Sequence, residues 1–367
     1  MPTLQINIIS EQTIPNILFI KQFEGQTDGY VFVSTPKMNQ QGQLQAIIEV
    51  CQIPANNYQV ITVNEESLAD VETQLETLHF NQNTHYLVNI TGGTKIMSLG
   101  VYSFFLRFNS QMYYLPIGKN DCKQIFPPAN ETVLALQYRV SLRQYLQAYG
   151  IGITNLHDIN SLVQNPAVTQ TFLNNKVSLN PLIRSLRAYK EQREYEERQK
   201  ITHLPLRNLP PELSTLNNLL QSLHFKPQKQ NELNENELNY LLGQWLEEYV
   251  YSTIKNLFGL DAHFIGNSVL IHRQKVANEL DVVLIYSNTI YVIECKTGLN
   301  ILIFNETAYK LNALKKEFGL YVKSAIVCLN VFKDITNRLR LFDIKLISGR
   351  NTTDKTLFEA QLKQFIK

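Results

Sequence analysis

The first 140 residues alternate between two spacings of hydrophobic positions. Five short runs rich in β-branched and aromatic residues have the pattern typical of strands: residues 4–9, 30–33, 58–63, 86–90 and 112–115. Helix-length stretches lie between them, at residues 40–50, 65–78 and 95–108. Strands that alternate with helices predict an α/β domain with a mainly parallel, Rossmann-like sheet, which binds ligands at the carboxyl ends of its strands.

The pattern changes after residue 140. Residues 141–148 and 184–200 favour helices, and we interpret the second, rich in Glu, Lys and Arg, as a solvated helix face. Prolines and an Asn/Gln/Glu-rich segment, 228–236, are typical of linkers. A second α/β pattern then begins, with helices at 237–258 and 306–318 and strands at 268–272, 280–286, 290–295 and 324–329. Between two of these strands, Ser287 and Asn288 predict a tight hairpin turn.

Composition narrows the class of protein. A chain of 367 residues with 44% hydrophobic residues can form more than one core, and its net charge of +2 gives no overall basic field for nucleic acid. The four cysteines contain no C-x-x-C pair, which argues against a zinc site and a disulfide framework. Because neither a signal peptide nor an apolar run of membrane-spanning length is evident, we expect a soluble, cytoplasmic protein without membrane contact.

Charged residues interrupt two apolar strands of the second pattern. Glu294 and Lys296 share one face of their strand, because alternate strand residues point the same way, and Cys295 faces the other side. The hairpin brings Asp281 of the preceding strand close to Glu294. Phosphodiester hydrolysis needs such a set: Asp281, Glu294 and the Cys295 carbonyl would bind Mg²⁺ or Mn²⁺, and Lys296 would stabilise charge or position water. The alternative is an ion pair between Glu294 and Lys296 on an edge strand.

An acid, a short hairpin and then Glu-x-Lys resemble the PD-(D/E)xK nuclease superfamily, although no proline precedes Asp281. The superfamily commonly places a glutamate on the helix before the sheet. The resemblance gives this role to Glu247, with Glu248 as the competing candidate.

A second group of polar residues follows the strand at 86–90: Thr91, Gly92, Gly93, Thr94 and Lys95. Free N–H groups at the start of a helix favour anions, and glycine lets a phosphate approach the backbone. The loop therefore predicts a phosphate or nucleotide site, although it lacks the spacing of a Walker A loop. N-capping by a threonine is a structural role that is compatible with ligand binding.

With its surroundings, this loop resembles the CRISPR-associated Rossmann fold (CARF) domain. Segments rich in polar residues also follow the first two strands, and the resemblance adds four of their residues to the ligand site: Ser10, Gln12, Thr35 and Met38. A CARF domain joined to a PD-(D/E)xK domain resembles the ancillary nucleases of type III CRISPR systems. The domains would be a CARF sensor at 1–145, a helical connector at 146–235 and a nuclease at 236–367.

The resemblance implies a homodimer that binds one cyclic oligoadenylate, with cyclic tetra-adenylate expected, across its two-fold axis. Binding would switch on metal-dependent cutting of single-stranded DNA, RNA or both. One alternative is a non-catalytic, nucleotide-sensing DNA-binding regulator that uses the charged helix at 184–200, but the intact set of acids argues against it. Another is a CARF domain that also degrades its ligand, which the loop hydroxyls and Lys95 permit.

Overall fold

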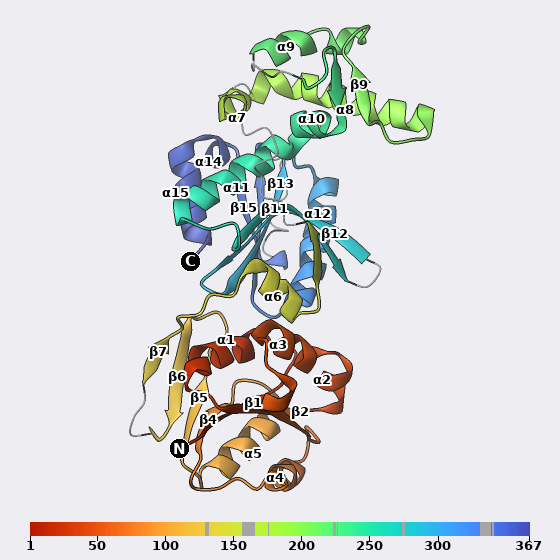
Figure 1. Cartoon of the computed structure of the whole chain (residues 1–367). Coiled ribbons are helices and arrows are strands. Elements are labelled where there is room, and N and C mark those ends of the chain that lie inside the picture. The colour runs from red at the N-terminus through yellow and green to blue at the C-terminus, as the bar shows by residue number, and fades with distance from the viewer. Residues whose placement is uncertain are drawn as a thin grey trace.

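The computed structural model describes residues 1–367 except 129–131, 156–165, 175, 223–224, 226, 274–275, 331–338 and 340. Figure 1 shows the first α/β unit at one end of an elongated molecule, the second α/β unit in the middle and the helices α7–α9 at the opposite end. The mixed α/β class predicted from the sequence is confirmed. Within the described part, no helix is long and apolar enough to cross a membrane.

The first unit is built on a seven-stranded sheet of order β3-β2-β1-β4-β5-β6-β7. Its strands are β1 (Thr3–Ile8), β2 (Gly29–Ser34), β3 (Tyr58–Thr62), β4 (His85–Asn89), β5 (Ser110–Tyr114), β6 (Asp121–Phe126) and β7 (Val133–Ala135). The first five are parallel, as predicted, and β6 and β7 extend the sheet antiparallel. The strand order reverses between β1 and β4, which opens a crevice at the carboxyl ends of these two strands.

Helices cover both faces of this sheet (Figure 1). One face packs against α1 (Ile14–Phe23) and α3 (Gln43–Cys51), with α2 (Pro36–Gln40) beside them, and the other against α4 (Leu68–Glu76) and α5 (Lys95–Phe105). The sequence pattern missed α1. Seven of its ten residues are buried, so hydrophobic residues occupy all sides of the helix and leave no period to detect.

The second unit is built on a six-stranded sheet of order β15-β14-β13-β12-β11-β8. Its strands are β8 (Gly152–Asn155), β11 (Ile265–Arg273), β12 (Val276–Tyr286), β13 (Thr289–Lys296), β14 (Val322–Cys328) and β15 (Ile344–Ser348). The predicted hairpin between β12 and β13 is confirmed, because Tyr286 pairs with Thr289 across a two-residue turn. Both turn residues, Ser287 and Asn288, have the positive φ angles that such a turn requires.

The helices of the second unit are α10 (Glu235–Asn239), α11 (Trp245–Phe258), α12 (Ile301–Glu317), α14 (Arg350–Thr353) and α15 (Lys355–Phe365). One helix was predicted over residues 237–258, but the chain leaves the helical conformation at Gly243, in a wide turn between α10 and α11. Helix α11 therefore begins at Trp245, and its first turn carries Glu247 and Glu248.

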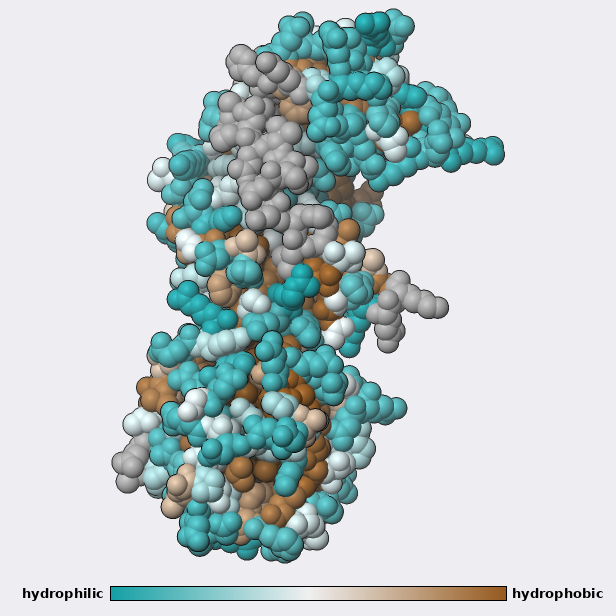
Figure 2. All heavy atoms as spheres, in the orientation of Figure 1, coloured by the Kyte–Doolittle hydropathy of each residue, from teal (hydrophilic) through white to brown (hydrophobic). Residues whose placement is uncertain are grey.

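The remaining region, expected as a helical connector, does not separate the two units. Its elements are α6 (Leu142–Ala148), β8, α7 (Pro166–Asn174), α8 (Lys176–Glu197), β9 (His203–Pro205), α9 (Leu216–Ser222) and β10 (Glu232–Asn234). Helix α6 lies between the units and β8 covers the edge of β11, whereas α7–α9 lie at the far end of the molecule (Figure 1). The surface at that end is largely hydrophilic, which fits a solvated face on α8 (Figure 2). Part of this region, residues 156–165, lies outside the described residues.

The two α/β units touch directly and share one hydrophobic cluster, which runs from α1 and α3 through α6 to the second sheet. Thr13 donates a hydrogen bond to the carbonyl of Ala148 (2.8 Å), and Tyr145 donates one to the carbonyl of Phe318 (3.1 Å). Burial of apolar surface in this cluster therefore holds the two units together.

The hairpin turn contributes to this contact through Asn288. Its Oδ1 accepts from the N–H of Val140 (2.8 Å), and its Nδ2 donates to Asn120 (2.6 Å) and to the carbonyl of Tyr138 (3.0 Å).

We expect Asn288→Ala to lower the free energy of unfolding by about 2–4 kcal/mol, since three hydrogen bonds are lost. Asn208→Ala is the control in urea denaturation, because exposed Asn208 has the same left-handed backbone. Equal losses in the two variants would show that only backbone strain matters.

Candidate functional site

The structure brings together the three charged residues predicted at the end of the β12–β13 pair. Val282 pairs with Ile293, so Asp281 and Glu294 occupy the next positions of the two strands. Both are buried, with 8% of Asp281 and 1% of Glu294 exposed. The Nζ of Lys296 donates to Oδ2 of Asp281 at 2.9 Å and to Oε2 of Glu294 at 3.2 Å.

These contacts determine the charge states of the cluster. Burial by itself lowers the pKa of Lys296, but the carboxylates of Asp281 and Glu294 outweigh it and raise the pKa above its usual value. Asp281 Oδ2 also accepts a hydrogen bond from the backbone N–H of Cys295 at 2.7 Å. The Cys295 thiol packs in the hydrophobic cluster on the other side of β13, and burial raises its pKa well above the usual value. Cys295 can therefore take part only through its backbone.

A second lysine, Lys310, completes the cluster and was missed by the sequence analysis. It lies on α12, and its Nζ donates to Oε1 of Glu294 at 2.7 Å and to the carbonyl of Glu279 at 2.6 Å. Each oxygen of the Glu294 carboxylate thus has its own lysine. No sequence pattern marks this residue, because a lysine on an amphipathic helix ordinarily points to water.

The two neighbouring glutamates of α11 point to different places. Glu247 accepts a hydrogen bond from the hydroxyl of Ser268 (2.8 Å) on β11. Burial and then the charge of nearby Asp281 raise the pKa of Glu247 to about 8. Glu248 instead lines a separate hollow with Thr169 and Ser252. The geometry therefore favours Glu247 over Glu248 as the glutamate of the cluster.

The cluster fits a divalent cation by its chemistry and charge. Glu247, Asp281 and Glu294 bring three carboxyl groups together with two ammonium groups, so negative charge is in excess once Glu247 loses its proton. Carboxylate oxygens are the ligands that Mg²⁺ and Mn²⁺ prefer. Nevertheless, among the described residues no three His, Cys, Asp or Glu side chains are already arranged around one point, because Lys296 and Lys310 occupy the carboxylate oxygens.

A cavity of about 370 Å³ lies at the crevice between β1 and β4 in the first unit. All but one of the residues predicted for the ligand site line it: Ser10, Gln12, Thr35, Met38, Thr91, Gly92, Gly93 and Thr94. Lys95 is the exception, since it begins α5, is exposed and lies outside the lining. One lining residue, Lys37, was not predicted, although it belongs to the polar segment after β2. Lys37 forms an ion pair with Glu11 (2.8 Å).

The loop after β4 owes its glycines to close packing. A Cβ on Gly92 would collide with the carbonyl oxygen of Ile8, and Gly93 has φ +76° and lies against the side chain of Ile8. The threonines have structural partners as well: Thr91 Oγ1 accepts from the N–H of Leu115 (2.9 Å), and Thr94 caps α5. The N-capping expected for Thr94 is therefore present beside the cavity.

The second unit contributes to the rim of this cavity. Leu320, in the segment between α12 and β14, lines it together with Gln12. The N–H of Leu320 and the hydroxyl of Tyr149 both donate to Oε1 of Gln12, at 2.9 and 3.3 Å. Gly319 has φ +97°, and a Cβ there would collide with Tyr149 and Gln12. The two units therefore meet in close contact at the edge of the cavity.

Comparisons with known proteins match two family models, one to each α/β unit of the chain. The family model described as the Card1 CARF domain matches residues 4–145, and the model described as the Card1-like endonuclease domain matches residues 234–362. A comparison with curated proteins found no match.

Two solved structures share the fold over the whole chain. Protein VC1899 from Vibrio cholerae is 20% identical, with a TM-score of 0.79, and the match covers 99% of this chain and 98% of that one. Can2 from Sulfobacillus thermosulfidooxidans, solved with cyclic tetra-adenylate, is 20% identical, with a TM-score of 0.77, and the match covers 100% of this chain and 99% of that one. The chain thus combines a Card1 CARF domain with a Card1-like endonuclease domain, and it belongs to the CRISPR-associated CARF nucleases.

Proposed function

We propose that this nuclease is activated by a cyclic oligoadenylate, specifically cyclic tetra-adenylate. Once activated, it cuts single-stranded DNA, RNA or both, with Mg²⁺ or Mn²⁺ as the metal. It acts in type III CRISPR defence in the cytoplasm. The cluster of Asp281, Glu294 and Lys296 inside the endonuclease domain carries the proposal. Can2, which shares the fold, was solved with cyclic tetra-adenylate, and this supports the choice of activator.

Each residue of the cluster has a role in phosphodiester hydrolysis. Asp281, Glu294 and the Cys295 carbonyl would hold the metal, which supplies Lewis-acid polarisation of the phosphate and a more acidic water. Lys296, kept protonated by the two carboxylates, donates hydrogen bonds to a phosphate oxygen or to the attacking water. The pKa of Glu247, near 8, lets its carboxyl hold a proton or exchange it with water at neutral pH.

Activation follows from the contact between the cavity and the endonuclease domain. A ligand that touches Leu320 and Gln12 interacts with both domains at once, so its affinity and their relative position are linked. Leu320 follows α12, the helix that carries Lys310 to Glu294. A shift of α12 would release one oxygen of Glu294, which a metal needs.

A homodimer suits the same cavity. Ile96 and Leu99 of α5 are exposed, at 36% and 60%, just beyond the loop that lines it. A second copy would cover these apolar side chains, and a ring of repeated nucleotides would meet the same residues in each copy.

The alternatives have less support. Buried carboxylates are costly, so a non-catalytic regulator has little reason to retain Asp281 and Glu294. Degradation of the ligand by the CARF domain is not favoured either, because Thr91 and Thr94 are engaged with backbone atoms and Lys95 does not line the cavity.

The first test is cleavage of labelled single-stranded DNA, single-stranded RNA and supercoiled plasmid in Mn²⁺ or Mg²⁺, with and without cyclic tetra-adenylate. We expect cutting only with the activator. Glu294→Gln or Lys296→Gln should slow it by at least about 100-fold, because transition-state charge loses its stabilisation. Activator affinity should be unchanged, and Glu359→Gln on α15 is the control. Wild-type rates in the two variants would refute the site assignment, and bound activator without any cutting would favour a non-catalytic sensor.

Metal binding can be tested without substrate. The carboxyl oxygens of the cluster should let Mn²⁺ bind, and a metal at 100 times its dissociation constant should stabilise the folded protein by about 2.7 kcal/mol. We therefore expect Mn²⁺ to raise the melting temperature of the wild type but not that of Asp281→Asn. Asp261→Asn, at an exposed position, should respond like the wild type. The same rise in all three proteins would place the metal elsewhere.

The contact at Gly319 can be tested through the ratio of rates with and without activator. Gly319→Ala should reduce this ratio about tenfold or more, since a side chain there forces Leu320 away from Gln12, and coupling energies are of this order. Gly259→Ala is the control, because Gly259 also has a positive φ but has no atom near its missing Cβ. An unchanged ratio in Gly319→Ala would show that this contact does not carry the signal.

A further inference from the structure

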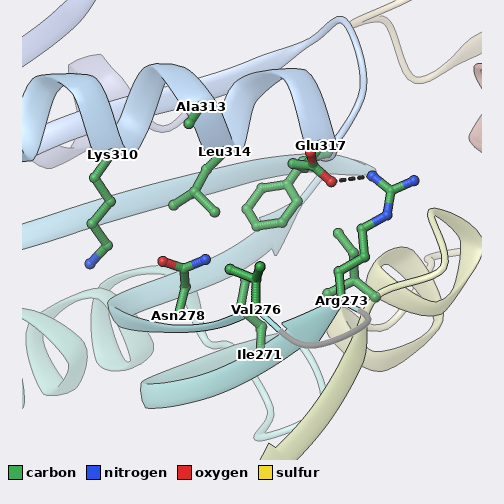
Figure 3. A pocket seen from close by; sticks show the side chains of 10 residues that line it. Ile271, Arg273, Val276, Asn278, Lys310, Ala313, Leu314 and Glu317 are labelled. Carbon is green, nitrogen blue, oxygen red and sulfur yellow. Dashed lines mark hydrogen bonds and ion pairs between the residues drawn. The ribbon is translucent and has the colours of Figure 1, made fainter.

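A groove of about 530 Å³ runs beside the acidic cluster, outside the residues proposed for catalysis (Figure 3). The β11–β12 hairpin forms one wall with Ile271, Arg273, Val276 and Asn278, and α12 forms the other with Lys310, Ala313, Leu314 and Glu317. The groove therefore lies between two elements of the endonuclease domain.

The inner end of the groove meets the cluster. Lys310 lines the groove, and the same Nζ donates to Glu294 at 2.7 Å. Figure 3 shows Asn278 on the strand wall at the end where Lys310 lies. A strand whose phosphate is held at Asp281 and Glu294 would thus place its next nucleotide in the groove.

The outer end carries a second cation. Arg273 forms an ion pair with Glu317 across the groove, as the dashed line in Figure 3 shows. Both side chains are nearly half exposed, so the pair is weak enough to open for a competing phosphate. The guanidinium of Arg273 can then bind the phosphate through two parallel hydrogen bonds.

The floor between the two cations is apolar. Ile271, Leu314 and Phe318 lie beneath it, each at most 5% exposed, and the side chain of Val276 stands at the mouth, 63% exposed. An apolar surface with a cation at each end suits a flat base between two phosphates. Contacts to the face of a base do not read its hydrogen-bonding edge, so this groove would have little preference for sequence.

We propose that this groove binds one unpaired nucleotide of the strand next to the phosphate that is cut, which makes the enzyme selective for single strands. The proposal rests on the endonuclease function above and identifies where its substrate lies. In a duplex the bases are stacked inside and only phosphates and groove edges face the protein. The apolar floor then has nothing to contact, and Lys310 and Arg273 alone provide weaker binding.

Binding is measured apart from cutting, by fluorescence anisotropy of labelled single-stranded DNA and RNA on the full chain with cyclic tetra-adenylate and Ca²⁺. Val276→Asp puts a negative charge at the mouth of the groove and should weaken single-strand binding about tenfold, or about 1.4 kcal/mol. Activator affinity should not change, and duplex affinity should fall less than single-strand affinity, because a duplex does not enter the groove. Val133→Asp is the matched control, because Val133 of β7 is also 63% exposed. Equal affinities of Val276→Asp and Val133→Asp would overturn the proposal.

A second pair of variants, one of which should bind single strands more tightly, tests the groove even if Val276→Asp folds poorly. Ala313→Lys adds a cation to the α12 wall at an exposed helical position, and Ala360→Lys makes the same change on α15. Only Ala313→Lys should bind single strands more tightly, and its logarithmic salt slope should steepen by about 0.7. Identical slopes in the two variants would exclude the groove.

These outcomes are distinct from failure of the proposed function. A wild type that binds single strands through the groove but cuts nothing would refute the nuclease activity and leave the groove assigned. A wild type that cuts normally, with Val276→Asp and Ala313→Lys unchanged in binding and rate, would refute the groove and leave the nuclease assigned.

Discussion

The burial of two carboxylates at the end of β12 and β13 constrains the surrounding structure. Asp281 and Glu294 are almost fully removed from water between apolar strands, which is unfavourable unless opposite charge lies within contact distance. Lys296 from β13 and Lys310 from α12 supply that charge, so the position of α12 against the sheet is tied to the charge balance of the site. The Glu247 carboxyl, once it loses its proton, adds the negative charge that a divalent cation would neutralise.

The direct contact between the two domains also depends on burial, in this case of apolar side chains. A single hydrophobic cluster passes from the helices of the CARF domain through α6 to the endonuclease sheet, and the hairpin turn at Asn288 is hydrogen-bonded across the boundary. As a result, the ligand cavity and the carboxylate cluster are connected through packed elements, from Gln12 and Leu320 to α12 and Lys310. The groove beside α12 shares this connection, so a movement of the helix would affect activation and substrate binding together.

Local pattern accounts for much of the fold. The five parallel strands of the first sheet and the β12–β13 hairpin have clear alternation or turn residues, and each formed within a few residues of its predicted range. Helix α1 was missed because it is buried on nearly all sides, and β6 because Asp121, Lys123 and Gln124 make half of its six residues polar and weaken its hydrophobic pattern. The break at Gly243 was not predicted, because the spacing of hydrophobic residues does not reveal a change in backbone conformation.

The sequence by itself determined which charged residues come together at the end of β12 and β13. The alternation of a strand places Glu294 and Lys296 on one face, and the hairpin brings Asp281 to them, because both effects act over short distances along the chain. Only the tertiary structure shows that Glu247 rather than Glu248 lies near Asp281, that Lys310 contacts Glu294, and that Leu320 lines the ligand cavity. Each of these depends on how a helix or a loop packs against a distant element, and packing is set by the whole hydrophobic core rather than by neighbouring residues.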